Sequence, residues 1–132
     1  MTKEQIANAI ACCGLLCFLC QPSDICNCRT NNHCGKHLSP DGCFQYNCCI
    51  SRSFNGCWEC PNAPCGNDMR APGKTKIRAF ITYLKEDGID SFSEYIVRNA
   101  NNGIVYHREG VLGDYDLDSE NDVLNLLRTG SI

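Results

Sequence analysis

All thirteen cysteines of this 132-residue chain lie between Cys12 and Cys65. So dense a group of thiols has two common explanations: a disulfide framework in an oxidising compartment, or thiolates that bind metal in a reducing one. The odd number leaves one cysteine over in a closed set of disulfides, which favours metal binding. Cysteine chemistry therefore constrains the N-terminal half more strongly than any apolar pattern does.

The segment before the cysteines does not match an export signal. Lys3 is offset by Glu4, and only about six apolar residues precede Cys12, where a signal needs roughly 7–15. The apolar run that ends at Cys20 is also shorter than the roughly 20 residues that span a bilayer. We therefore expect a cytoplasmic protein that does not associate with membranes.

The distribution of charge argues against nucleic acid as a partner. The chain has 12 Lys and Arg against 15 Asp and Glu. Residues 1–72 carry five charges of each sign, so the acidic excess lies in the C-terminal part. No basic stripe is present to neutralise phosphates. A protein or a small molecule of unknown identity is the expected partner.

Two clusters give the strongest metal signal, Cys13-x3-Cys17-x2-Cys20 and Cys57-x2-Cys60-x4-Cys65. A two-residue spacer lets a tight turn place two sulfurs about 3.7 Å apart, as tetrahedral Zn–S bonds of ~2.3 Å require. Other thiols lie between the clusters, and two histidines are possible additional nitrogen ligands. The full set of candidates is Cys13, Cys17, Cys20, Cys26, Cys28, Cys34, Cys43, Cys48, Cys49, Cys57, Cys60 and Cys65, with His33 and His37.

Twelve thiols would fill three tetrahedral sites, so we expect two or three zinc ions. The remaining thiol, Cys12, is expected inside the first helix as a small buried apolar residue. Which thiols share a metal does not follow from their spacing. We expect the sites to be mainly structural, in a binding or adaptor module, and we identify no catalytic residue.

Two alternatives remain open. An iron–sulfur cluster for redox or electron transfer is one, since Cys13-x3-Cys17-x2-Cys20 has the spacing of radical enzymes, although the chain is too short for their barrel and lacks a ferredoxin-type run. The other is a small metalloenzyme, whose open zinc position would need a non-thiolate ligand such as His33 or His37.

The order of the cysteines carries a family resemblance. Cys-Gly-Leu-x-Cys-x2-Cys opens the pattern at residues 13–20, and Cys43-x4-Cys48-x8-Cys57-x2-Cys60-x4-Cys65 closes it. This pattern resembles the cysteine-rich domain-of-unknown-function family 3795 of bacteria and archaea. Ala63 stands where that family usually has Phe, and Pro40 stands where a further cysteine would fall. The resemblance implies metal binding and a cytoplasmic location, and it implies no catalytic activity.

The expected fold class is small and either α+β or mostly α. Residues 1–72 would form an irregular, metal-stapled module packed on a helical part at 73–132, and the two parts together would form one compact domain. Helices are predicted at residues 2–11, where Thr2 and Gln5 make a capping box, at 74–87 before Gly88, at 91–99, and from Ser119 to Gly130. Residues 104–107 are predicted to form a strand that turns at 109–110 into 111–112. Residues 23–72 are expected to lack regular elements and to need metal for order.

Four weaker signals have ordinary explanations. The acidic run at residues 114–118 fails as a calcium loop, because Ser119 and Asn125 stand where Gly and Glu are needed. His107 is expected to be exposed, and Trp58 to pack over the metal region. The basic residues at 74–78 are expected to form the polar face of their helix.

Overall fold

The computed structural model describes residues 2–16, 19, 44–63 and 75–131. These ranges hold the helices α1 (Lys3–Ala9), α3 (Phe44–Ser51), α4 (Thr75–Asn101) and α5 (Glu120–Thr129), and the 3-10 helix η2 (Cys57–Glu59). They contain no strand, so this part of the chain is helical. Of the two expected fold classes, the mostly helical one applies to it. The boundary predicted at residue 72 lies outside the described residues.

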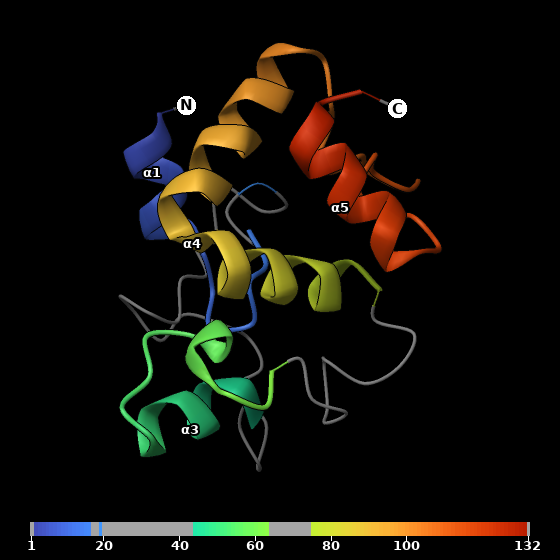
Figure 1. The fold of residues 1–132 in the computed structure, drawn as a ribbon. Coiled ribbons are helices and arrows are strands. Elements are labelled where there is room, and N and C mark those ends of the chain that lie inside the picture. Colours follow the sequence, from blue (N-terminus) through green and yellow to red (C-terminus); the bar gives the residue numbers. More distant parts are fainter. Residues whose placement is uncertain (1, 17–18, 20–43, 64–74, 132) are drawn as a thin grey trace.

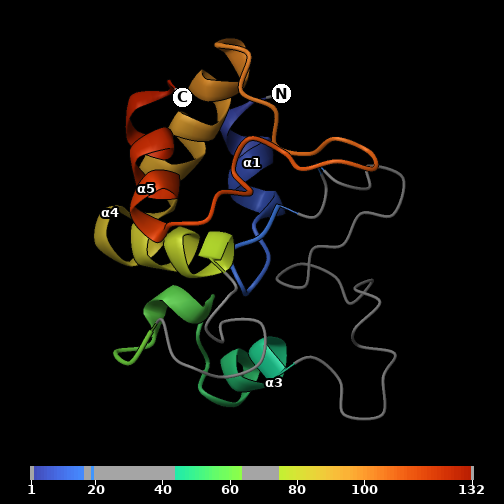
Figure 2. The same ribbon diagram turned by 90° about the vertical axis from the view of Figure 1, so that its right-hand side faces the viewer.

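The longest helix, α4, bends at Gly88. This residue has φ 88° and ψ 170°, a conformation that is accessible almost only to glycine. The helices predicted at 74–87 and 91–99 are therefore confirmed as two arms of α4. Figures 1 and 2 show the second arm between α1 and α5, while η2 and α3 lie beyond the first arm.

The ends of the two flanking helices follow the predicted capping signals. At α1, the Gln5 amide donates to Thr2 Oγ1 (3.1 Å) and the Thr2 amide donates to Gln5 Oε1 (2.8 Å). This helix ends at Ala9, before the predicted limit, because Ile10 is extended. At α5, Ser119 caps the start, and Gly130 closes the end in the left-handed region.

The core of the helical part is built from aromatic rings. Phe80 is fully buried, and its ring centroid lies 5.2 Å from that of Phe92, 5.7 Å from that of Tyr115 and 6.2 Å from that of Tyr106. Edge-on contacts of this kind add to the free energy of burying the rings. Phe80 and Phe92 lie on the two arms of α4, so the bend at Gly88 allows both to enter one core.

A buried amide attaches α5 to α4. Asn99 is fully buried, and its Nδ2 donates to Tyr115 Oη (3.0 Å) and to the Leu126 carbonyl (3.0 Å). Arg98 Nη2 donates to the carbonyls of Leu127 and Arg128, each at 2.9 Å. The last turn of a helix leaves carbonyls without helical partners. In α5, Arg98 satisfies two such carbonyls, and Asn99 gives the Leu126 carbonyl a second donor beside the Gly130 amide.

Two predictions of local structure are wrong. The strand at residues 104–107 is reduced to a single antiparallel bridge between Arg108 and Val111. The Val105 amide donates to an Asp114 carboxylate oxygen (2.7 Å), so a side chain occupies the place of a ladder acceptor. Residues 23–72 were expected to lack regular elements, yet α3 and η2 form there. The apolar residues of α3 are not gathered on one face, so periodicity could not reveal the helix.

None of the helices in the described ranges combines the length and the apolar character that crossing a bilayer requires.

Candidate metal centre

The structure describes five of the twelve predicted thiol ligands: Cys13, Cys48, Cys49, Cys57 and Cys60. It also describes Cys12, the thiol that was set aside as a non-ligand. The other predicted ligands lie outside the described residues: Cys17, Cys20, Cys26, Cys28, Cys34, Cys43 and Cys65, with His33 and His37.

The thiols of Cys49 and Cys57 are in direct contact. Their sulfurs are 3.7 Å apart, and the two residues are 1% and 2% exposed. Cys49 lies on α3 and Cys57 begins η2, so the contact joins two helices. The separation equals the edge of a tetrahedron whose centre is ~2.3 Å from each corner, the length of a Zn–S bond. The pair is therefore spaced as two ligands of one zinc ion would be.

Cys12 reaches the same place from the N-terminal segment. Its thiol is hydrogen-bonded to that of Cys49, and its carbonyl accepts from the Cys57 amide at 2.9 Å. Its predicted burial is confirmed, with 3% of the residue exposed. Its predicted helical setting is wrong, because α1 ends at Ala9 and Cys12 lies in the following turn.

The environment of Cys49 favours its neutral thiol when no cation is present. Hydrogen bonds with Cys12 and with Cys57, and then burial, raise the pKa of Cys49 far above its ordinary value. A coordinating metal would reverse this preference, because bound thiols are deprotonated. Within residues 2–16, 19, 44–63 and 75–131, no group of three or more Cys, His, Asp or Glu side chains is arranged to hold an ion. These residues alone do not form a complete coordination sphere.

The Cys-x2-Cys segment forms the tight turn that its spacing predicts. The Cys60 amide donates to the Cys57 carbonyl at 3.1 Å. Cys60 is 7% exposed, and its sulfur accepts from Arg52 Nη1 at 3.7 Å. Cys13 is also buried, whereas Cys48 is partly exposed on α3. The buried thiols of this region therefore come from three separate segments of the chain.

Trp58 is buried beside these thiols, with 6% of the residue exposed. This burial excludes a role as an exposed recognition residue. Its indole ring lies over Gly56, where an added Cβ would be only 2.2 Å from a ring carbon. Residue 56 must therefore be glycine for the ring to keep this place.

Two contacts hold the cysteine region against the helical part. Lys85 Nζ, from the first arm of α4, donates to the carbonyls of Pro61 and Ala63, each at 2.9 Å. Tyr106 Oη accepts from the Leu16 amide at 3.0 Å in a buried position. Tyr106 thus holds the segment that carries Cys12, and Lys85 holds the segment that carries Cys60.

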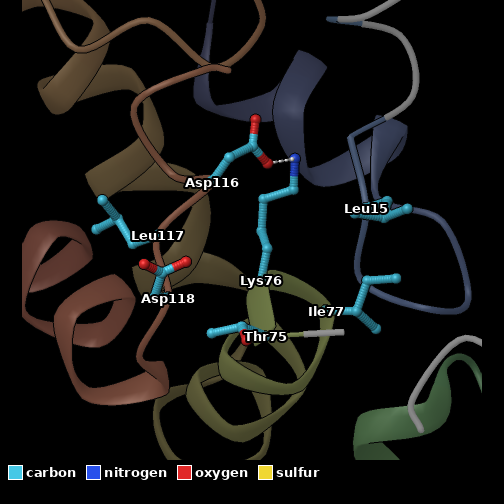
Figure 3. Close-up of a pocket in the computed structure, with 7 residues that line it drawn as sticks. All are labelled: Leu15, Thr75, Lys76, Ile77, Asp116, Leu117 and Asp118. Atoms are coloured by element: carbon cyan, nitrogen blue, oxygen red, sulfur yellow. Dashed lines mark ion pairs between the residues drawn. The ribbon is translucent and has the colours of Figure 1, made fainter. Parts of the chain in front are cut away.

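A pocket of about 540 Å³ opens where the loop after α1 meets the start of α4 (Figure 3). It is lined by Leu15, Thr75, Lys76, Ile77, Asp116, Leu117 and Asp118. Lys76 extends along it to pair with Asp116 at 2.8 Å, and its ammonium lies 4.7 Å from the centre of the Tyr106 ring. The ammonium of Lys76 is therefore paired with groups of the protein itself. The wall offers no concentration of charge of one sign.

The remaining sequence signals have structural roles. Burial alone would raise the pKa of Asp116, but hydrogen bonds from Lys76 and from the Gly113 amide outweigh it and lower the pKa. The pKa of Asp114 is lowered by hydrogen bonds from Arg108 and from the Val105 amide. Both carboxylates thus support the fold through ion pairs, Asp116 with Lys76 and Asp114 with Arg108. His107 is exposed, as expected.

Comparison with known proteins adds no relative. No protein-family model, no curated protein and no solved structure matches the chain. The resemblance to domain-of-unknown-function family 3795 therefore stays a prediction from the order of the cysteines. What the chain can bind has to be inferred from its own thiols.

Proposed function

We propose that this chain is a cytoplasmic zinc-binding protein whose thiolate sites are structural, and that it serves as a binding or adaptor module. One observation carries the proposal: the sulfurs of Cys49 and Cys57, on separate helices, are 3.7 Å apart in a buried position. Membership of domain-of-unknown-function family 3795 is part of the same proposal.

The chemistry of the donors supports zinc. Thiolates are soft ligands and select zinc, copper(I) or iron–sulfur clusters over magnesium and calcium. The spacing of Cys49 and Cys57 suits two ligands of a tetrahedral ion, and Cys12 lies within hydrogen-bonding distance of Cys49. The cysteines outside the described residues would supply the other ligands.

Burial supports a structural role over a catalytic one. A catalytic zinc keeps a coordination position open to water or substrate, whereas a structural zinc is closed by four protein ligands. Cys49, Cys57 and Cys12 are each at most 3% exposed, which leaves no approach for a substrate from their side. Bound zinc contributes ~10–16 kcal/mol of apparent binding free energy in small model peptides. That amount would order a region in which thiols replace large apolar side chains.

The proposal is tested on anaerobically purified protein. We expect elemental analysis to find zinc, and X-ray absorption at the zinc edge to show sulfur neighbours at ~2.3 Å. We expect Cys49→Ser to lower the zinc content. Ile50→Ser is the matched control, because Ile50 is the next residue of α3 but is 59% exposed. This control should retain zinc.

Two results would contradict the proposal. Protein that contains iron and no zinc, with broad absorbance near ~400 nm, would indicate an iron–sulfur cluster, since zinc is colourless. Protein that contains neither metal, even after zinc is added under reducing conditions, would show that the thiols are not ligands.

A further inference from the structure

Cys49 and Cys57 are eight residues apart in the sequence, and their thiols are in contact in the fold. Their sulfurs are 3.7 Å apart, and a disulfide bond is about 2.05 Å long. Closing the bond therefore requires the two sulfurs to approach by about 1.7 Å. Rotation of the side chains and a small shift of one helix can supply a movement of this size.

The helix that carries Cys49 is the segment best placed to move. Among the described elements, α3 packs chiefly against η2, whereas η2 also packs against α4. The turn that joins α3 to η2 is short, and within it the Phe54 amide donates to the Cys49 carbonyl at 2.8 Å. A shift of α3 toward η2 would not disturb the aromatic core.

Cys12, the other neighbour of Cys49, belongs to a fixed segment. Its carbonyl accepts from the Cys57 amide, and a Cβ added at Gly14 would lie in contact with Phe80, Ile81 and Leu84 of α4. The loop that holds Cys12 is therefore part of the helical core. Among the described residues, Cys49 contacts Cys12 and Cys57, and Cys57 is the one that a short turn joins directly to α3.

We propose that Cys49 and Cys57 form a disulfide when a hydroperoxide oxidises the protein, and that this closure releases the zinc ion they share. The release rests on the proposed zinc-binding function, whereas the disulfide rests only on the geometry of the two thiols. Oxidation would thereby regulate the metal site, because a disulfide takes two thiolate ligands from the ion.

The reaction balances with hydrogen peroxide as the oxidant. The first sulfur attacks one peroxide oxygen, the O–O bond breaks, and a sulfenic acid and one water form. The second sulfur attacks the sulfenic sulfur, the S–S bond forms, the S–O bond breaks, and a second water leaves. Two thiols lose two electrons and two protons, and the peroxide accepts both. When the sulfurs start as zinc-bound thiolates, water supplies the two protons, two hydroxide ions remain, and the metal leaves as Zn²⁺.

The experiment treats the full-length, zinc-loaded protein with hydrogen peroxide. Remaining thiols are then alkylated, cross-linked peptides are mapped by mass spectrometry, and released zinc is followed with a chromogenic chelator. Trypsin cuts after Arg52, between the two cysteines, so the disulfide joins two peptides whose fragments assign it. We expect a Cys49–Cys57 cross-link that accumulates in step with zinc release. Cys49→Ser should abolish this cross-link, and Cys48→Ser, a change of the adjacent thiol, should keep it.

The outcomes separate this inference from the proposed function. Zinc release without a Cys49–Cys57 cross-link, or with Cys12–Cys49 as the main cross-link, would overturn the inference and leave the zinc function standing. A protein that never holds zinc but forms the Cys49–Cys57 bond would overturn the zinc function and the regulation, while the disulfide itself would be confirmed. Oxidised protein that keeps its zinc although the cross-link is complete would show that the pair does not share the ion.

Discussion

The helical region at residues 75–131 and the cysteine region at residues 44–63 bury different kinds of side chain. The helical region encloses Phe80, Phe92, Tyr83 and Tyr115, each at most 2% exposed. The cysteine region encloses thiols together with the single indole of Trp58. A large side chain contributes about 1.5–3 kcal/mol when it is buried, and a thiol contributes less. The first region can fold on its apolar surface alone, whereas the second needs a further source of stability.

Removal of metal should produce the largest difference in behaviour between the two regions. If zinc orders the cysteine region, a strong chelator under reducing conditions should collapse the amide signals of residues 44–63 in a ¹⁵N correlation spectrum. Signals of residues 75–131 should stay dispersed, because aromatic and aliphatic side chains supply most of the surface that these residues bury. Unchanged signals throughout would show that no metal orders the cysteine region, and loss of all signals would show that the two regions are not independent.

Truncation at the centre of the aromatic core should produce the largest effect of a single substitution. Phe80→Ala removes a ring that contacts three other rings. We expect the free energy of unfolding to fall by roughly 3–5 kcal/mol, the usual cost of such a cavity. Urea denaturation followed by circular dichroism measures it. Loss of zinc from the folded variant would contradict the separation of the two regions.

Asn99→Ala tests the polar attachment of α5. It removes a buried donor from Tyr115 Oη and from the Leu126 carbonyl. We expect a loss of about 2–3 kcal/mol, because the Tyr115 hydroxyl loses its buried donor and the Leu126 carbonyl keeps only the Gly130 amide. Asn125→Ala, at an exposed position of α5, should change stability little. Equal effects of the two substitutions in urea denaturation would show that burial of the amide contributes nothing.

Tyr106→Phe tests the connection between the regions. The ring stays in the core, but the Leu16 amide loses the hydroxyl that accepts its hydrogen bond. We expect a loss of about 1 kcal/mol, together with faster hydrogen exchange at the Leu16 amide. Exchange at α5 should be unaffected. An unchanged rate of hydrogen exchange at Leu16 would show that this hydrogen bond does not hold the loop that carries Cys12 and Cys13.

Ser93→Ala should have the smallest effect. Ser93 Oγ is buried and has no hydrogen-bond partner among the residues that the structure describes. Because a buried hydroxyl without a partner is unfavourable, we expect unchanged or slightly higher stability, within about 1 kcal/mol. The melting temperature is sufficient to measure it. A clear decrease would show that this hydroxyl has a partner in the folded protein.

The helical region could be predicted because its signals are local. Thr2 with Gln5, Ser119 and Gly130 mark helix ends through contacts that lie within a few residues. Gly88 marks the bend in the same way. The strand at residues 104–107 was mispredicted because its alternation of apolar residues could not show that the Asp114 carboxylate would accept the hydrogen bond of the Val105 amide.

The candidate site could be predicted in composition but not in arrangement. The spacing of Cys57 and Cys60 indicated a tight turn, which the structure contains. The contact between Cys49 and Cys57 joins two helices, and no spacing rule links an α-helical thiol to a thiol eight residues away. Cys12 was not counted as a ligand, because twelve other thiols already fill three sites of four ligands each. In the structure its thiol nevertheless contacts that of Cys49. Contacts of this kind depend on the tertiary fold.

The bend at Gly88 determines how much surface one helix can organise. Without it, the 27 residues of α4 would form a straight rod of about 40 Å at 1.5 Å per residue. A rod of that length would extend past a domain of this size and leave one end in solvent. Bent at this residue, the same segment is the common platform on which α1, α5 and η2 all pack. One residue without a side chain thus allows a chain with few helices to enclose a shared interior.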